Sequence, residues 1–185
     1  MFREIQVLID YSLVGITIAI IALVIFFIYI SILSISFIYM AKFSNDLKKK
    51  RESLNIGIYQ KCEYLNKLAV ILEKYLNENS PLKIFSLNEE FKKYTKLKAD
   101  EIEEFYSYTE KILKDAQKIY IDCDLGAEKK EVEGIFLAIS DINKNYLETV
   151  QIYNSLVIGY NYWRNLFSTR WFKHILFIRE KKSIK

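Results

Sequence analysis

The chain has 185 residues, of which 51% are hydrophobic, and a formal net charge of +4. The only histidine, His174, lies in a basic tail without a nucleophile pattern beside it, which argues against a catalytic triad and excludes a His-rich metal site. Because there is also no Gly-rich phosphate loop, we expect no enzyme, no cofactor and no metal. Acidic residues are interspersed with the basic ones, so we expect no nucleic-acid partner.

The first element is an apolar segment, residues 11–41, in which no Asp, Glu, Lys or Arg occurs. A helix needs about 20 apolar residues to cross a bilayer, so residues 1–41 are expected to be a short N-terminus and a transmembrane anchor. A cleaved signal would be shorter, and a core helix of this length would be hard to surround in so small a domain. The only basic residue before the segment is Arg3, whereas five basic residues follow it closely: Lys42, Lys48, Lys49, Lys50 and Arg51. This asymmetry of positive charge predicts that the N-terminus lies outside the cell and that the rest of the chain lies in the cytoplasm.

The next part, residues 42–166, has apolar residues at gaps of three and four throughout, which predicts long amphipathic helices at 42–77, 87–121 and 127–166. The residues Asn77–Pro81 should end the first helix, and Ser86 with Glu89 should cap the second. Asp122–Gly126 should form the next turn, and short connections should make neighbouring helices antiparallel. We therefore expect an all-α protein: a transmembrane helix that continues into an elongated antiparallel bundle of long helices.

The last part, residues 167–185, is expected to be a short amphipathic segment that mixes aromatic and basic residues. Its candidate interface residues are Arg170, Trp171, Phe172, Lys173, Phe177 and Arg179. Such a segment suits a membrane surface, but it also suits a cap on the bundle or a partner-binding site. With three antiparallel helices the tail would begin at the end far from the membrane, which favours the cap or the partner site.

A repeated Tyr-Asn pair stands out in the third predicted helix, at Tyr153–Asn154 and Tyr160–Asn161. A spacing of seven places both tyrosines on one face, with the asparagines beside them. We interpret the tyrosines as rings buried in a helix seam and the asparagines as register-fixing bonds to a neighbouring helix. An exposed docking strip is the alternative.

The stretch YNSLVIGYN and the Phe that follows it resemble a motif of the bacterial LemA family. The matching positions are Tyr153, Asn154, Val157, Tyr160, Asn161 and Phe167. The resemblance implies a bacterial inner-membrane protein with one membrane helix and a long-helix bundle. On this basis we expect a non-catalytic scaffold or adaptor that contacts the bilayer through its N-terminal helix and binds membrane or cytosolic proteins, with homo-oligomerisation left open. The alternative is a sensor that binds a small ligand between its helices, in a polar cavity near Tyr153, Tyr160 and Asn161.

Overall fold

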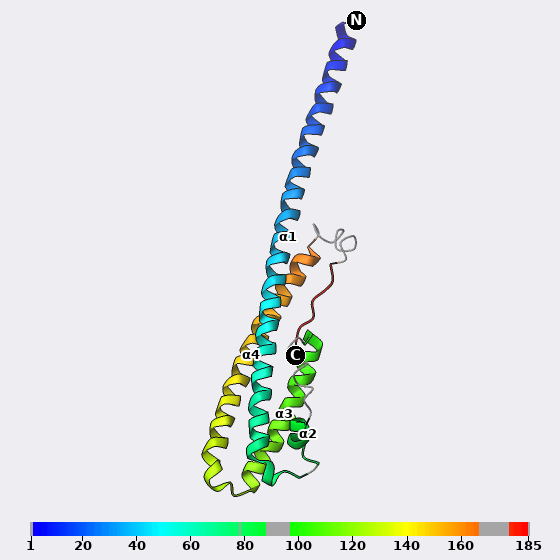
Figure 1. Cartoon of the computed structure of the whole chain (residues 1–185). Helices are drawn as coiled ribbons and strands as arrows, with labels where there is room; N and C mark the ends of the chain where they lie inside the picture. Colours follow the sequence, from blue (N-terminus) through cyan, green and yellow to red (C-terminus); the bar gives the residue numbers. More distant parts are fainter. Residues whose placement is uncertain (1, 78, 88–96, 167–177, 185) are drawn as a thin grey trace. The chain divides into compact units, whose positions relative to one another are not determined.

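The computed structural model describes residues 2–77, 79–87, 97–166 and 178–184; for residues 2–12, 86 and 87 it describes the backbone alone. Every regular element in these ranges is a helix, which confirms the all-α class (Figure 1). The α-helices are α1 (Phe2–Ile71), α2 (Pro81–Leu87), α3 (Ala99–Asp122) and α4 (Lys129–Asn165), with short 3-10 turns η1 (Glu73–Tyr75) and η3 (Gly126–Glu128).

The chain divides into two compact units. The anchor unit comprises residues 1–42 and 160–180, and the bundle unit comprises residues 43–159 and 181–185. Helices α1 and α4 each contribute to both units, because neither contains a proline that would interrupt its hydrogen bonds.

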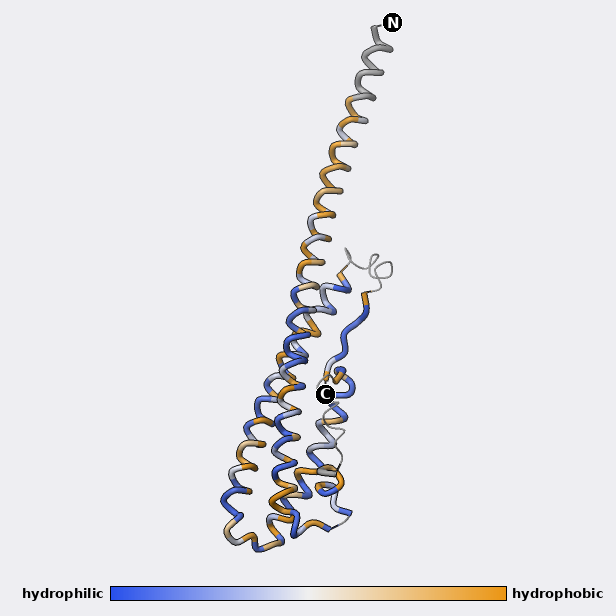
Figure 2. Tube along the Cα trace, in the orientation of Figure 1, coloured by the Kyte–Doolittle hydropathy of each residue, from blue (hydrophilic) through white to orange (hydrophobic). Residues whose placement is uncertain are grey.

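In the anchor unit, α1 carries a long apolar surface that Figure 2 shows as an almost continuous run of hydrophobic residues. Between Leu13 and Ile35 nearly every side chain is exposed. An 18-residue window of this helix has a mean hydropathy of 3.0, and none of that window is buried. The helix is therefore long and apolar enough to cross a membrane.

The bundle unit contains α1 from Phe43 onward, α2, α3 and α4 up to Gly159. Its core is lined by residues that recur every seventh position, such as Leu47, Leu54 and Leu68 of α1. On α4 the same spacing buries Val132, Ile139, Tyr146 and Tyr153. A repeat of seven keeps one face of each helix turned toward its neighbours at a shallow crossing angle.

The contacts between helices give their directions. Asn55 of α1 contacts the carbonyl of Leu97, and Lys61 contacts Glu110 of α3, so these two helices run in the same direction. By contrast, Tyr120 of α3 contacts Glu133 of α4, and Glu110 contacts Asn143, so α4 runs antiparallel to α3. Helix α4 is consequently antiparallel to α1 as well.

The parallel direction of α3 differs from the expectation of a single returning helix over 87–121. Leu97 and Lys98 are not helical, and α3 begins only at Ala99, where the Lys98 amide donates to the Glu101 carboxylate at 2.7 Å. Ser86 lies inside α2, and its expected capping partner Glu89 lies outside the described residues. Leu97 lies beside Asn55, and from there α3 runs in the direction of α1.

This connectivity corrects the expected position of the tail. Helix α4 runs antiparallel to α1 in the bundle unit, and its last residues, from Tyr160, belong to the anchor unit together with the apolar part of α1. Within the anchor unit, Trp163 of α4 stacks on Tyr39 of α1 with ring centroids 4.6 Å apart. The end of α4 therefore lies beside the α1 residues around Tyr39 in this unit, which differs from the expectation that the tail begins far from the membrane helix.

Candidate functional site

A lysine occupies a core position of the bundle unit. Lys61 belongs to the same seven-residue series as Leu47, Leu54 and Leu68, and its side chain is 0% exposed. A buried ammonium group is costly unless it is paired and hydrogen-bonded, so its partners indicate what this part of the core is built to do.

The partners of Lys61 come from α3 and, through a shared carboxylate, from α4. Its ammonium group donates a hydrogen bond to Glu110 Oε1 and lies 4.1 Å from the centre of the Tyr106 ring. Asn143 donates to the same carboxylate oxygen at 3.0 Å, and Tyr106 stacks on Tyr146 with ring centroids 3.8 Å apart. We call these five residues the polar cluster; it joins α1, α3 and α4.

Burial shifts the titration of the groups in and beside the polar cluster. It lowers the pKa of Lys61, against the opposing effect of Glu110. Burial, together with Glu110, raises the pKa of Tyr106 to about 12, and burial raises the pKa of the neighbouring Cys62 thiol to about 12. Both groups are therefore protonated at neutral pH, when the thiol is a poor nucleophile. The cluster offers one ion pair and several hydrogen-bonding groups.

Two polar atoms of the cluster have no hydrogen-bond partner among the described residues. They are Asn143 Oδ1 and the Tyr146 hydroxyl, and both are buried. Buried polar atoms without a protein partner are usually satisfied by bound water or by a ligand.

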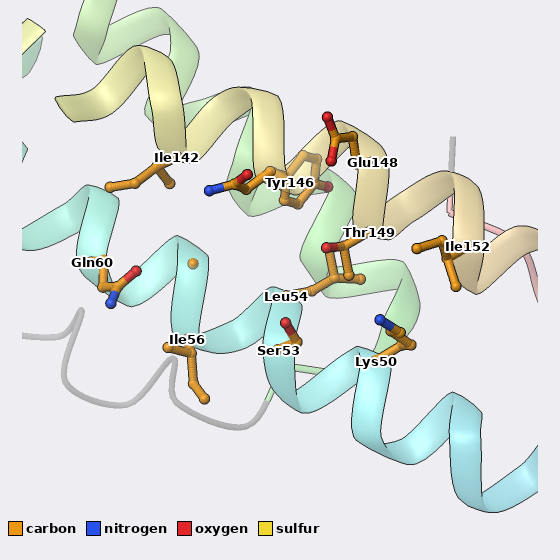
Figure 3. A pocket seen from close by; sticks show the side chains of 12 residues that line it. Lys50, Ser53, Leu54, Ile56, Gln60, Ile142, Tyr146, Glu148, Thr149 and Ile152 are labelled. Atoms are coloured by element: carbon orange, nitrogen blue, oxygen red, sulfur yellow. The ribbon is translucent and has the colours of Figure 1, made fainter. Parts of the chain in front are cut away.

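A groove lies beside the cluster, between α1 and α4, and has a volume of about 430 Å³. Figure 3 shows that side chains of both helices line it. Its polar lining comes from Lys50, Ser53 and Gln60 of α1 and from Asn145, Glu148 and Thr149 of α4, and Tyr146 connects it with the polar cluster. Gly57 adds no side chain to the groove, and a Cβ there would meet nothing within 4 Å.

The motif residues lie on a different stretch of α4. Tyr153, Val157 and Tyr160 are buried, and burial raises the pKa of both tyrosines. Asn154 and Asn161 are half-buried, and Phe167 lies outside the described residues. The tyrosine rings thus occupy the helix seam, while the groove surrounds Tyr146 and does not extend to the motif residues.

Among the described residues Asn154 bonds to the C-terminal segment rather than to a neighbouring helix, which differs from our interpretation of this asparagine. Its amide nitrogen donates to the carbonyl oxygen of Ile184 at 2.6 Å, and its amide oxygen accepts from the amide of Ile184 at 2.9 Å. The Ile184 side chain is 1% exposed. Asn154 therefore binds the backbone of the C-terminal segment at two points.

The C-terminal segment has no helix in its described part, residues 178–184. Of the candidate interface residues, Arg179 is exposed, while Arg170, Trp171, Phe172, Lys173 and Phe177 lie outside the described residues. In the anchor unit, Arg164 donates to the carbonyl of Ile178 at 3.0 Å and lies 3.7 Å from a Glu180 carboxylate oxygen.

The sequence patterns missed the polar cluster. The signal in the sequence was that Lys61 occupies one position in a series of leucines spaced by seven. However, the next residue, Cys62, is apolar and suits the core, so Lys61 is easily assigned to the solvent-facing side of the helix. Glu110 and Asn143 gave no local signal, because each lies among other charged and amide residues on its helix. Comparison of the chain with protein-family models, curated proteins and solved structures finds no match.

Proposed function

We propose that this chain is a LemA-like, single-pass protein of the bacterial inner membrane, and that its cytoplasmic bundle is a non-catalytic adaptor for other proteins. The apolar surface of α1 supports the anchor, and the basic residues after it support the cytoplasmic side. The observation that carries the adaptor role is the two-point contact between Asn154 and Ile184.

An asparagine that accepts from a backbone amide and donates to the carbonyl of the same residue binds as a neighbouring β-strand would. Such a contact selects extended backbone, not a particular side chain. Selectivity comes from the burial of Ile184, which requires an apolar side chain at that position. The partner that fits is an extended peptide with an isoleucine-sized residue, of which the chain's own end is one example.

The test uses a full-length protein and a variant that ends at Glu180, both in detergent micelles, and a fluorescent peptide with the sequence of residues 178–185. The shortened variant should bind the peptide, and the full-length protein should bind it more weakly because its own end competes. Adding Asn154→Ala should weaken binding by about 5- to 150-fold, since it removes two hydrogen bonds of about 0.5–1.5 kcal/mol each.

The matched control is Asn145→Ala, an exposed asparagine on the same helix. It should leave peptide affinity unchanged. If the shortened variant does not bind the peptide, or if both asparagine variants lose the same affinity, the adaptor proposal loses its main support.

A ligand-binding role is the second candidate, and the groove with its unsatisfied cluster favours it. A polar small molecule in the groove would lie against Tyr146 and between Lys50 and Glu148. Native mass spectrometry of the protein purified from membranes should then detect an added mass. Gly57→Leu should abolish that mass by filling the groove, whereas Gly134→Leu, at an exposed glycine outside it, should not. If no added mass is detected, the ligand-binding role is refuted.

A further inference from the structure

The exposure of α1 changes at one point within the anchor unit. From Leu13 to Ile35 the side chains are exposed almost throughout. Beyond that point Ser36 and Met40 are buried, and Tyr39 stacks on Trp163 with the rings 4° from parallel. The last turn of α4 therefore contacts α1 at Tyr39, near the end of its apolar run.

The length of the exposed stretch matches a bilayer. Leu13–Ile35 spans about 34 Å at 1.5 Å per residue, against about 30 Å for the hydrocarbon core. If this stretch crosses the core, Ser36 to Ala41 lie in the headgroup layer, which adds about 5–8 Å on each side of the core. The turns of α4 that pack against these residues must then lie at the same depth.

The residues at this level have the chemistry of a membrane interface. Tyr162 is 61% exposed and meets Trp163 edge to face, with ring centroids 5.7 Å apart. Tyrosine and tryptophan favour the headgroup region because each joins an apolar ring to a polar group. Lys42 and Arg179 are exposed in the same unit and supply positive charge for anionic lipids.

We infer that the end of α4 is a second lipid contact, in which Tyr162 and Trp163 lie in the headgroup layer beside Tyr39. This inference rests on the proposed membrane anchor. It assigns the exposed Tyr162 ring to lipid, because Trp163 beside it stacks on Tyr39 at the end of the apolar run of α1.

Tryptophan fluorescence can measure the depth, because the chain has only two tryptophans. The variant Trp171→Phe leaves Trp163 as the single tryptophan, which can be excited selectively over tyrosine. The full chain is reconstituted in vesicles of neutral and anionic phospholipids whose acyl chains carry bromine near the headgroup or near the chain end. Trp163 should be quenched more strongly by bromine near the headgroup.

Two further variants, each with a single tryptophan at another position, distinguish a failure of the proposed lipid contact from a failure of the membrane anchor. Phe26→Trp lies in the exposed apolar stretch and should be quenched most by bromine near the chain end. Leu147→Trp, on the exposed side of α4 in the bundle unit, should not be quenched. If Phe26→Trp is quenched but Trp163 is not, the anchor stands and the lipid contact is wrong, which would leave the aromatic surface to a protein partner. If Phe26→Trp is not quenched, the anchor itself is wrong.

Discussion

Replacing Lys61 and replacing Glu110, the two members of the ion pair in the polar cluster, should lower the free energy of unfolding by different amounts. Lys61 is 0% exposed, whereas the Glu110 side chain is 32% exposed. Glu110→Gln leaves a buried ammonium with only the face of Tyr106 and a neutral amide as neighbours. Lys61→Met leaves a carboxylate that water can reach and that Asn143 still hydrogen-bonds.

The expected losses in the free energy of unfolding follow from this difference in burial between Lys61 and Glu110. Removing one partner of a buried pair costs about 3–5 kcal/mol. Because partial exposure admits water near Glu110, we expect Glu110→Gln to lower the free energy of unfolding by about 3 kcal/mol, at the lower end of that range. Lys61→Met gives up the pair and a cation–π contact but also removes the desolvation cost, so its effect should be within about 1 kcal/mol.

The assay is a urea titration of the full chain in detergent micelles, followed by far-UV circular dichroism. The double variant Lys61→Met/Glu110→Gln should resemble Lys61→Met, since no buried charge is left. Glu104→Gln, an exposed carboxylate on the same helix, is the control and should have almost no effect. If Lys61→Met costs as much as Glu110→Gln, the reasoning from unequal burial is refuted.

Three other predictions concern helix packing, pH and orientation. A Cβ at Gly159 would lie 2.7 Å from Phe43 Cε1, so Gly159→Ala should destabilise the bundle by about 1–3 kcal/mol. In the control Gly134→Ala the new Cβ meets nothing within 4 Å, so this change should stabilise α4 by about 0.5–1 kcal/mol. If thermal unfolding shows the same effect for Gly159→Ala and Gly134→Ala, the close approach of Gly159 to Phe43 is contradicted. The pKa of Cys62 is raised from 9.0 to about 12, so the stability it contributes is complete below pH 9 and is lost as pH rises toward 12. The wild type should lose up to about 4 kcal/mol over that range relative to Cys62→Ala in urea titrations, and parallel pH profiles would exclude the effect. In a Cys62→Ala background, a membrane-impermeant maleimide should label Cys123 only after cells are permeabilised; labelling of intact cells would place the bundle outside.

The patterns that can be read without a structure are those that depend on neighbours along the chain. The charge-free run from Tyr11 to Ala41 predicted one long apolar helix, and gaps of three and four predicted helices throughout. These properties are local, because a helix closes its hydrogen bonds within four residues and one face of it is set by periodicity. The seam positions Tyr153, Val157 and Tyr160 followed from the same periodicity.

Three features depended on contacts between distant residues. Leu97 lies beside Asn55, so α3 runs parallel to α1, and α4 runs antiparallel to both within the bundle unit. That arrangement brought Lys61, Glu110 and Asn143 together from three helices. It also left Asn154 to bind the backbone of Ile184, a partner 30 residues away. Periodicity places a side chain on a face, but only the direction and pairing of the helices decide what that face meets.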